Sequence, residues 1–144
     1  MASCACIRPR QGVRLHVRQH RLTLRLQMPG HSFAFGIGYP ELIVNCSSMY
    51  PLETEFWCSS LDISRGEALY TWLEGFLTEL TAMLPNTLYH LGGDEVQYQC
   101  WADSPAMVSY LAQRNMTGVQ LYQEFEYRLL HGIVTDDPDT PCCC

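Results

Sequence analysis

The sequence predicts an α/β protein with a parallel sheet, and three observations lead to that prediction. Apolar residues recur every three or four positions through residues 69–84, which is the spacing of one buried face of a helix. Residues 87–91 form a short apolar run bounded by Pro-Asn and Gly-Gly, as a buried strand would be. Two more helical patterns follow that run, and a strand flanked by helices is typical of α/β folds.

The first segment, residues 1–27, is basic and alternating. Residues 1–40 hold six arginines and no acid, whereas the remaining residues hold three arginines and all 15 acids. Apolar and polar residues alternate through residues 13–18 and 22–26, which predicts strand with one solvated face. The change in charge marks residues 1–27 as a segment distinct from residues 28–131.

Residues 28–63 are aromatic and rich in glycine and proline, and we expect a long loop there. Ser64 and Glu67 then form a capping-box pattern that opens the helix ending before Pro85. The strand at residues 87–91 follows that helix.

Ser104 followed by proline predicts a helix that runs to about Arg114. Thr117 and Gln120 form another capping-box pattern, which predicts a final helix. Residues 132–144 contain three aspartates, two prolines and a triple cysteine, and we expect an unstructured tail.

Composition excludes several classes of protein. With 47% hydrophobic residues the chain can bury a core, yet no apolar run approaches the length of a membrane span. The N-terminus lacks the apolar stretch of a secretory signal, so none is readable. The basic segment has no aromatic residues to stack on bases, and its Cys-x-Cys spacing does not favour zinc. We therefore expect no nucleic-acid partner, no metal and no cofactor.

Eight cysteines are many for a cytosolic protein and indicate an oxidising compartment. Two glycosylation sequons, at Asn45 and Asn115, are compatible with the same route.

Two adjacent acids, Asp94 and Glu95, follow the predicted strand at residues 87–91. Active sites of α/β sheets lie at the carboxyl ends of strands, and the preceding Gly92 and Gly93 leave room for a ligand. Because adjacent carboxylates repel each other, one pKa should rise and make a general acid, while the other group stays ionised. The alternative is a solvated turn. Nearby aromatic residues could form sugar-stacking or core surfaces: Tyr89, Tyr98 and Trp101.

Residues 89–96, continuing to Trp101, resemble the signature of the family 20 glycoside hydrolases, the β-N-acetylhexosaminidases. Residues 28–32 and 36–42 look like the preceding active-site loop of the same family. The similarity covers residues 28–131 and implies a fragment of a (β/α)8 TIM barrel, with about two βα units. It is an incomplete barrel, because a complete one needs roughly 200 residues or more.

The resemblance also implies an activity, the removal of terminal N-acetylhexosamine from glycans by a retaining, substrate-assisted mechanism. By analogy Glu95 is the general acid/base and Asp94 orients the 2-acetamido group. His31 either lies near the acid and tunes it or lines the sugar site. His90 and Trp101 are weaker candidates for substrate contact.

Further expectations come from the same resemblance. A disulfide between Cys46 and Cys100 would contribute about 4 kcal/mol, and the location would be lysosomal or secreted. The family usually has Glu-x-Asp at the end of the strand before the first block, where this chain has Arg25 and Gln27.

Two alternatives stay open. The chain is a truncated, non-catalytic fragment or binding module, which would need a second copy or a completing chain to cover its exposed strand edges. More remotely, Gly-Gly-Asp-Glu is similar to the hairpin of diguanylate cyclases, although Val96 replaces the phenylalanine of that motif.

Overall fold

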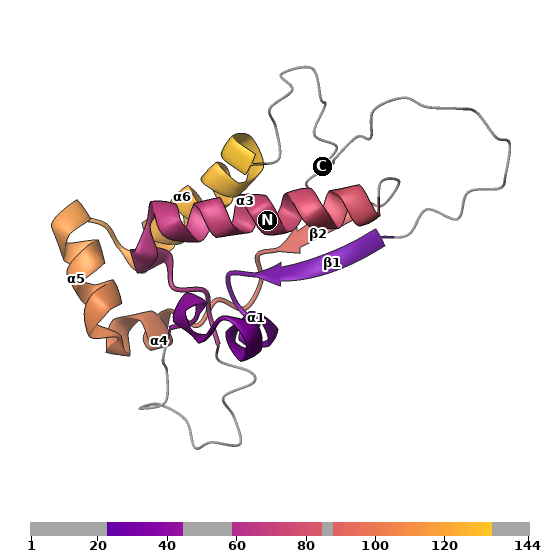
Figure 1. Ribbon diagram of the computed structural model, residues 1–144. Coiled ribbons are helices and arrows are strands. Elements are labelled where there is room, and N and C mark those ends of the chain that lie inside the picture. The colour runs from indigo at the N-terminus through magenta and orange to yellow at the C-terminus, as the bar shows by residue number, and fades with distance from the viewer. Residues whose placement is uncertain (1–22, 45–58, 85–87, 134–144) are drawn as a thin grey trace, which may run out of the picture.

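The computed structural model describes residues 23–44, 59–84 and 88–133. Two strands, β1 (Thr23–Met28) and β2 (Leu88–Gly92), pair in parallel, with Leu24 opposite Tyr89 and Met28 opposite Gly92. The chain crosses from β1 to β2 through the long helix α3 (Glu67–Met83), which runs alongside the strands (Figure 1). This β-α-β arrangement confirms the predicted α/β class and the predicted second strand.

The start of α3 differs from the prediction. Ser64 lies in a separate 3-10 turn, Ile63–Arg65, and its backbone N–H donates to the side chain of Asp62 at 3.1 Å. Gly66, with φ 58°, then turns the chain into the left-handed region before the helix begins. The predicted capping box is therefore wrong, because the N-cap of α3 is Gly66, which has no side-chain cap hydrogen bond.

The region predicted as one long loop contains a helix. Its described part includes α1 (Phe33–Gly38) and a 3-10 turn, Pro40–Leu42, and Gly30 and Ile43 each form a β-bridge, to Ser60 and Leu61. The helix α1 has no side-chain cap and contains no buried residue, so no pattern in the sequence marked it. The ring of Phe35 packs edge-on against two rings of α3. Its centroid lies 5.5 Å from that of Trp72 and 5.2 Å from that of Phe76.

Three helices follow β2: α4 (Tyr98–Asp103), α5 (Pro105–Arg114) and α6 (Gly118–Arg128), and a π-helical turn, Leu129–Ile133, extends the last. The side chain of Ser104 caps α5, as predicted. The capping box of Thr117 and Gln120 is also confirmed, since both reciprocal hydrogen bonds are present. The short helix α4 was not predicted.

The core lies between α3, the sheet and the C-terminal helices. Its largest fully buried side chains include Trp101, Phe125, Leu61 and Leu73. The indole N–H of Trp101 donates to Ser60 Oγ at 2.9 Å, so the buried polar atom has a partner. Among the described helices, none has both the length and the apolar character needed to cross a membrane.

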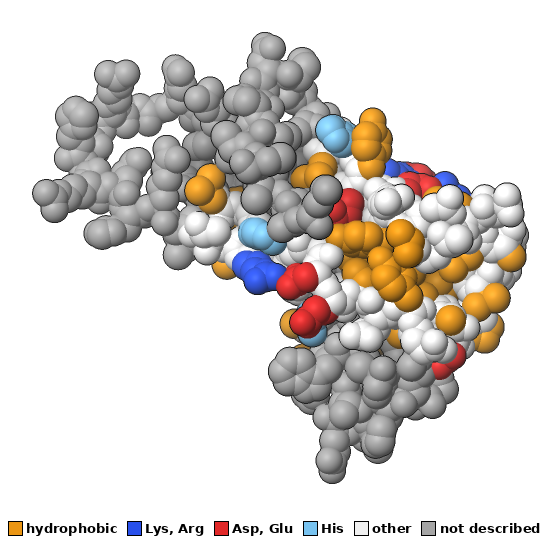
Figure 2. Space-filling view, turned by 180° about the vertical axis from the view of Figure 1, so that it is seen from behind, with side chains coloured by type: hydrophobic (Ala, Val, Ile, Leu, Met, Phe, Trp, Pro, Cys, Tyr) orange, Lys and Arg blue, Asp and Glu red, His pale blue; other side chains and the backbone are white. Residues whose placement is uncertain are grey.

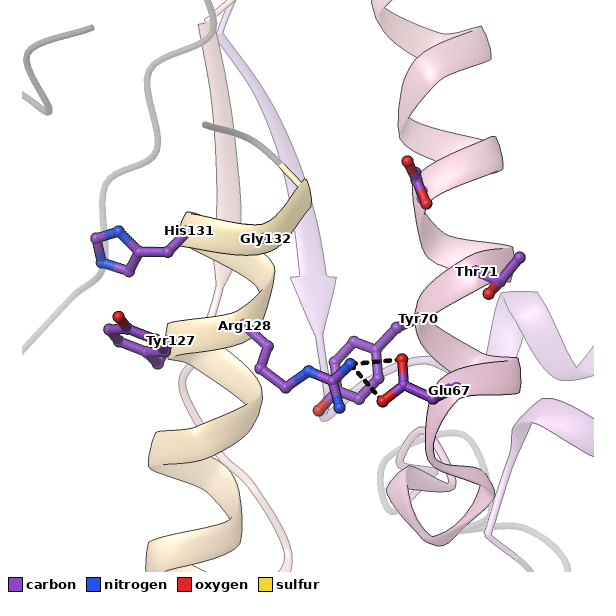
Figure 3. A pocket seen from close by; sticks show the side chains of 8 residues that line it. Glu67, Tyr70, Thr71, Tyr127, Arg128, His131 and Gly132 are labelled. Atoms are coloured by element: carbon purple, nitrogen blue, oxygen red, sulfur yellow. Dashed lines mark hydrogen bonds and ion pairs between the residues drawn. The ribbon is translucent and has the colours of Figure 1, made fainter. Parts of the chain in front are cut away.

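A second contact ties α3 to the end of the chain's last described helix (Figure 3). Arg128 donates to both carboxylate oxygens of Glu67, at 2.7 and 2.8 Å, and its guanidinium lies 3.7 Å over the ring of Tyr70. These groups line an open hollow of about 350 Å³ that includes His131. Because salt bridge and ring contact act together, they fix α6 against α3.

Candidate active site

The carboxyl end of β2 carries the predicted acids, and a glycine lets it reach β1. Gly92 has φ 85°, and a Cβ placed on it would lie 2.8 Å from the Cα of Gln27 and 2.8 Å from the backbone N of Met28. Only glycine therefore fits where the two backbones approach each other. The loop after β2 is in this way held against the end of β1.

Asp94 turns towards β1. Its two carboxylate oxygens each accept a hydrogen bond of 2.7 Å from Arg25 Nη2, and Oδ1 also accepts from the side-chain amide of Gln27. The hydrogen bond from Arg25, followed by that from Gln27, lowers the pKa of Asp94 from 3.8 to about 2. The side chain stays 53% exposed.

Glu95 turns towards the segment that follows β1. His31 Nε2 lies 2.7 Å from Glu95 Oε2, and both residues have positive φ, 54° for His31 and 58° for Glu95. Such angles are uncommon outside glycine and cluster at functional sites. Gly30 makes room for this loop, because a Cβ there would lie 3.1 Å from the carbonyl oxygen of Glu95.

The neighbouring acids thus have separate partners. The sequence predicted that their repulsion would raise one pKa, but for Asp94 the shift is downward, because a guanidinium binds it directly. Glu95 remains 68% exposed at its side chain and has an imidazole beside one oxygen. A carboxylate held by a guanidinium and a second, more accessible acid therefore follow each other directly in the chain. Figure 2 shows acidic, basic and histidine side chains gathered beside an apolar patch on one face.

The structure places His31 beside Glu95, and Arg25 and Gln27 beside Asp94, whereas the two weaker candidates make contacts of a structural kind. His90 is half-buried, and its Nδ1 accepts the backbone N–H of Gly92 at 3.0 Å, so it fixes the end of β2. Trp101 is 1% exposed in the core. Its indole has no surface to offer a sugar, and we assign it to packing.

Two residues of α6 that the sequence did not single out support the loop. The hydroxyl of Tyr122 donates to the carbonyl oxygen of Gly93 at 2.6 Å. Burial, and next a hydrogen bond with Glu126, raise the pKa of Tyr122. A Cβ on Gly93 would meet both side chains, at 2.7 and 2.5 Å. Their spacing of four places them on one face of α6, but nothing in that spacing identifies the loop they contact.

Cys100 forms a disulfide bond. Cys46, the partner that the resemblance implies, lies outside the described residues, as does Asn45. Asn115 is exposed at the end of α5, in the left-handed conformation. Among the described residues, no group of three or more His, Cys, Asp or Glu side chains could hold a metal ion.

A parallel pair of strands with acids at its carboxyl edge is the arrangement of α/β enzymes whose sites lie at that edge. The family model "Glycosyl hydrolase family 20, catalytic domain" matches residues 17–142 of this chain. The chain therefore belongs to glycosyl hydrolase family 20. The match begins before residue 28 and so includes β1 with Arg25 and Gln27.

Curated relatives agree with that family. Beta-hexosaminidase subunit A2 of Dictyostelium discoideum is 33% identical over 109 residues, which are 76% of this chain and 19% of that protein. Beta-hexosaminidase subunit alpha of Rattus norvegicus is 27% identical over 120 residues, 83% of this chain and 22% of that protein. Beta-hexosaminidase 1 of Arabidopsis thaliana is 31% identical over 103 residues, which are 72% of this chain and 17% of that protein. The chain spans about a fifth of the length of these relatives.

Proposed function

We propose that this site is the acid pair of a β-N-acetylhexosaminidase, which removes terminal N-acetylhexosamine from glycans with retention of configuration. One observation carries the proposal: Asp94 and Glu95 stand at the carboxyl end of β2, each with its own partner from the β1 side. Membership of the family supports it, and so does the printed name of the relatives. The family also explains the Gly-Gly-Asp-Glu run without a diguanylate cyclase.

In this mechanism the acetamido oxygen of the substrate attacks its own anomeric carbon, and the bond to the leaving group breaks. Glu95 gives its proton to the departing glycosidic oxygen, and its exposed carboxyl group can reach a bound sugar. Asp94 accepts a hydrogen bond from the acetamido N–H and stabilises the positive charge of the cyclic intermediate. Its lowered pKa keeps it ionised for that role. Glu95 then takes a proton from the water that opens the intermediate.

We further propose the setting of this site. The strands β1 and β2 would be neighbouring strands of a (β/α)8 barrel, and the matched residues 17–142, which include β1, would form its partial catalytic domain. A second copy or a completing chain would supply the rest. The protein would be lysosomal or secreted, with Cys46 bonded to Cys100 and glycans on Asn45 and Asn115, of which Asn115 is exposed.

The test is hydrolysis of a chromogenic N-acetyl-β-glucosaminide by the purified chain. Glu95→Gln should lower the rate by roughly 10²–10⁴-fold, the range for loss of a general acid. Glu79→Gln is the matched control, because it removes another exposed acid, on α3, that is outside the site. Equal rates for the wild type and Glu95→Gln would contradict the assigned role. A folded wild type that binds the sugar without cleaving it would favour the binding-module alternative.

A further inference from the structure

The carboxylate of Asp94 receives three side-chain hydrogen bonds, and all three come from β1. Arg25 and Gln27 stand two residues apart on that strand, so their side chains point to the same face of the sheet. They lie 69 and 67 positions away from Asp94 in the chain and reach it through the parallel register of the strands. This contact therefore exists only in the folded protein.

The three hydrogen bonds are distributed unequally over the two oxygens. Oδ1 accepts from Arg25 and from Gln27, whereas Oδ2 accepts from Arg25 alone among the side chains of the described residues. A carboxylate oxygen has about two acceptor positions. Oδ1 thus has two side-chain donors on β1, whereas Oδ2 has one.

A small contribution to folding stability does not by itself account for this contact. Arg25 and Asp94 are 54% and 53% exposed at their side chains, and ion pairs that open to solvent contribute little to folding. The effect of Arg25 falls instead on the charge and the orientation of Asp94. The guanidinium is itself held on β1, because Arg25 Nε donates to Gln27 Oε1 at 2.9 Å while Arg25 Nη2 lies 2.7 Å from both oxygens of Asp94.

We propose that Arg25, assisted by Gln27, is a positioning residue that holds Asp94 ionised, turned away from Glu95, with Oδ2 presented to an amide N–H of the ligand. This inference rests on the proposed function for the identity of that ligand, an N-acetylated sugar. The two adjacent acids consequently do not share a proton. Asp94 acts as a fixed acceptor, and Glu95 keeps its separate partner, His31.

The experiment is a pH titration of the Asp94 carboxyl carbon by NMR in the full chain, without sugar. Arg25→Gln should raise the pKa of Asp94 from about 2 towards 3.8, by at least about one pH unit, because a directly bound cation lowers a carboxyl pKa by about one to three. Arg25→Lys should give an intermediate value, since it restores the charge but not the Nε–H that donates to Gln27. Arg65→Gln, which removes the partner of Asp62, is the control and should leave Asp94 unchanged.

A titration of the wild type in low and in 1 M KCl is the second measurement, and it needs no variant to fold. Salt at 1 M screens charge interactions beyond about 3 Å, so the pKa of Asp94, whose ion pair with Arg25 is exposed, should rise. If the pKa of Asp94 changes neither with 1 M KCl nor with Arg25→Gln, the proposal is overturned. The proposal is also overturned if the control Arg65→Gln shifts the pKa of Asp94 as much as Arg25→Gln does. Because no substrate is present, these outcomes do not depend on whether the chain hydrolyses a glycoside.

Discussion

Replacing Gly92 by alanine should destabilise the chain where the loop after β2 lies against the backbone of β1. The new Cβ would lie 2.8 Å from the Cα of Gln27, 2.8 Å from the backbone N of Met28 and 3.0 Å from the carbonyl oxygen of Leu26. All three are backbone atoms of β1, so no side-chain rotation relieves the contact. Overpacking costs about 1–3 kcal/mol, and a left-handed φ in a residue with a Cβ costs roughly 1–2 kcal/mol. We expect a loss of about 2–5 kcal/mol in the free energy of unfolding.

Urea denaturation followed by tryptophan fluorescence measures this loss. Gly75→Ala is the matched control, because a Cβ on Gly75 meets nothing within 4 Å and the position is inside α3. That change should stabilise the chain by about 0.5–1 kcal/mol, the usual gain for alanine over glycine in a helix. If Gly92→Ala lowers the free energy of unfolding by less than about 0.5 kcal/mol, the close approach of β1 to the acid loop is refuted.

The remaining predictions concern the last helix and the acid itself. Thr117→Ala should cost about 1 kcal/mol in a urea denaturation, since it removes the capping box of α6. Thr117→Ser should restore most of it, and equal stability of all three chains would contradict this account of the cap. Tyr122→Phe removes the hydrogen bond to the Gly93 carbonyl and should cost about 0.5–1.5 kcal/mol. Hydrogen exchange should also show faster opening of the loop at Gly93, and unchanged exchange would count against that support. The folded pKa of Asp94 lies below its ordinary value, so its contribution to stability is complete above about pH 3.8 and is lost as the pH falls towards 2. In acid unfolding, the stability gap between wild type and Arg25→Gln should narrow over that interval, and a constant gap would contradict the ion pair.

Local signals in the sequence predicted local structure well. The caps at Ser104 and Thr117 each place a polar side chain next to the N–H groups it binds, so three or four residues contain the whole interaction. The acids at the end of β2 were also predictable, because a short apolar run and its Gly-Gly boundary locate the carboxyl end of a strand. The hydrogen-bond partners of these acids were not predicted.

That setting depends on contacts between distant segments. Arg25 stood out in the sequence as a departure from the family, but no local pattern shows that strand register brings it to Asp94. The helix α1 escaped prediction because six residues without a cap or a buried side chain carry too weak a signal. The capping box predicted at Ser64 was wrong for the opposite reason. Its sequence pattern matched, but Gly66, with a positive φ, separates Ser64 from the helix.

The central claim, that Asp94 recognises an acetamido group beside the acid Glu95, is tested most directly by comparing two sugars. N-acetylglucosamine and glucose are titrated into the labelled chain while the amide signals of His31 and Gly93 are followed. We predict that N-acetylglucosamine shifts both signals, that glucose does not, and that Asp94→Asn weakens the response. Equal shifts with the two sugars, or a response that Asp94→Asn leaves intact, would contradict the claim.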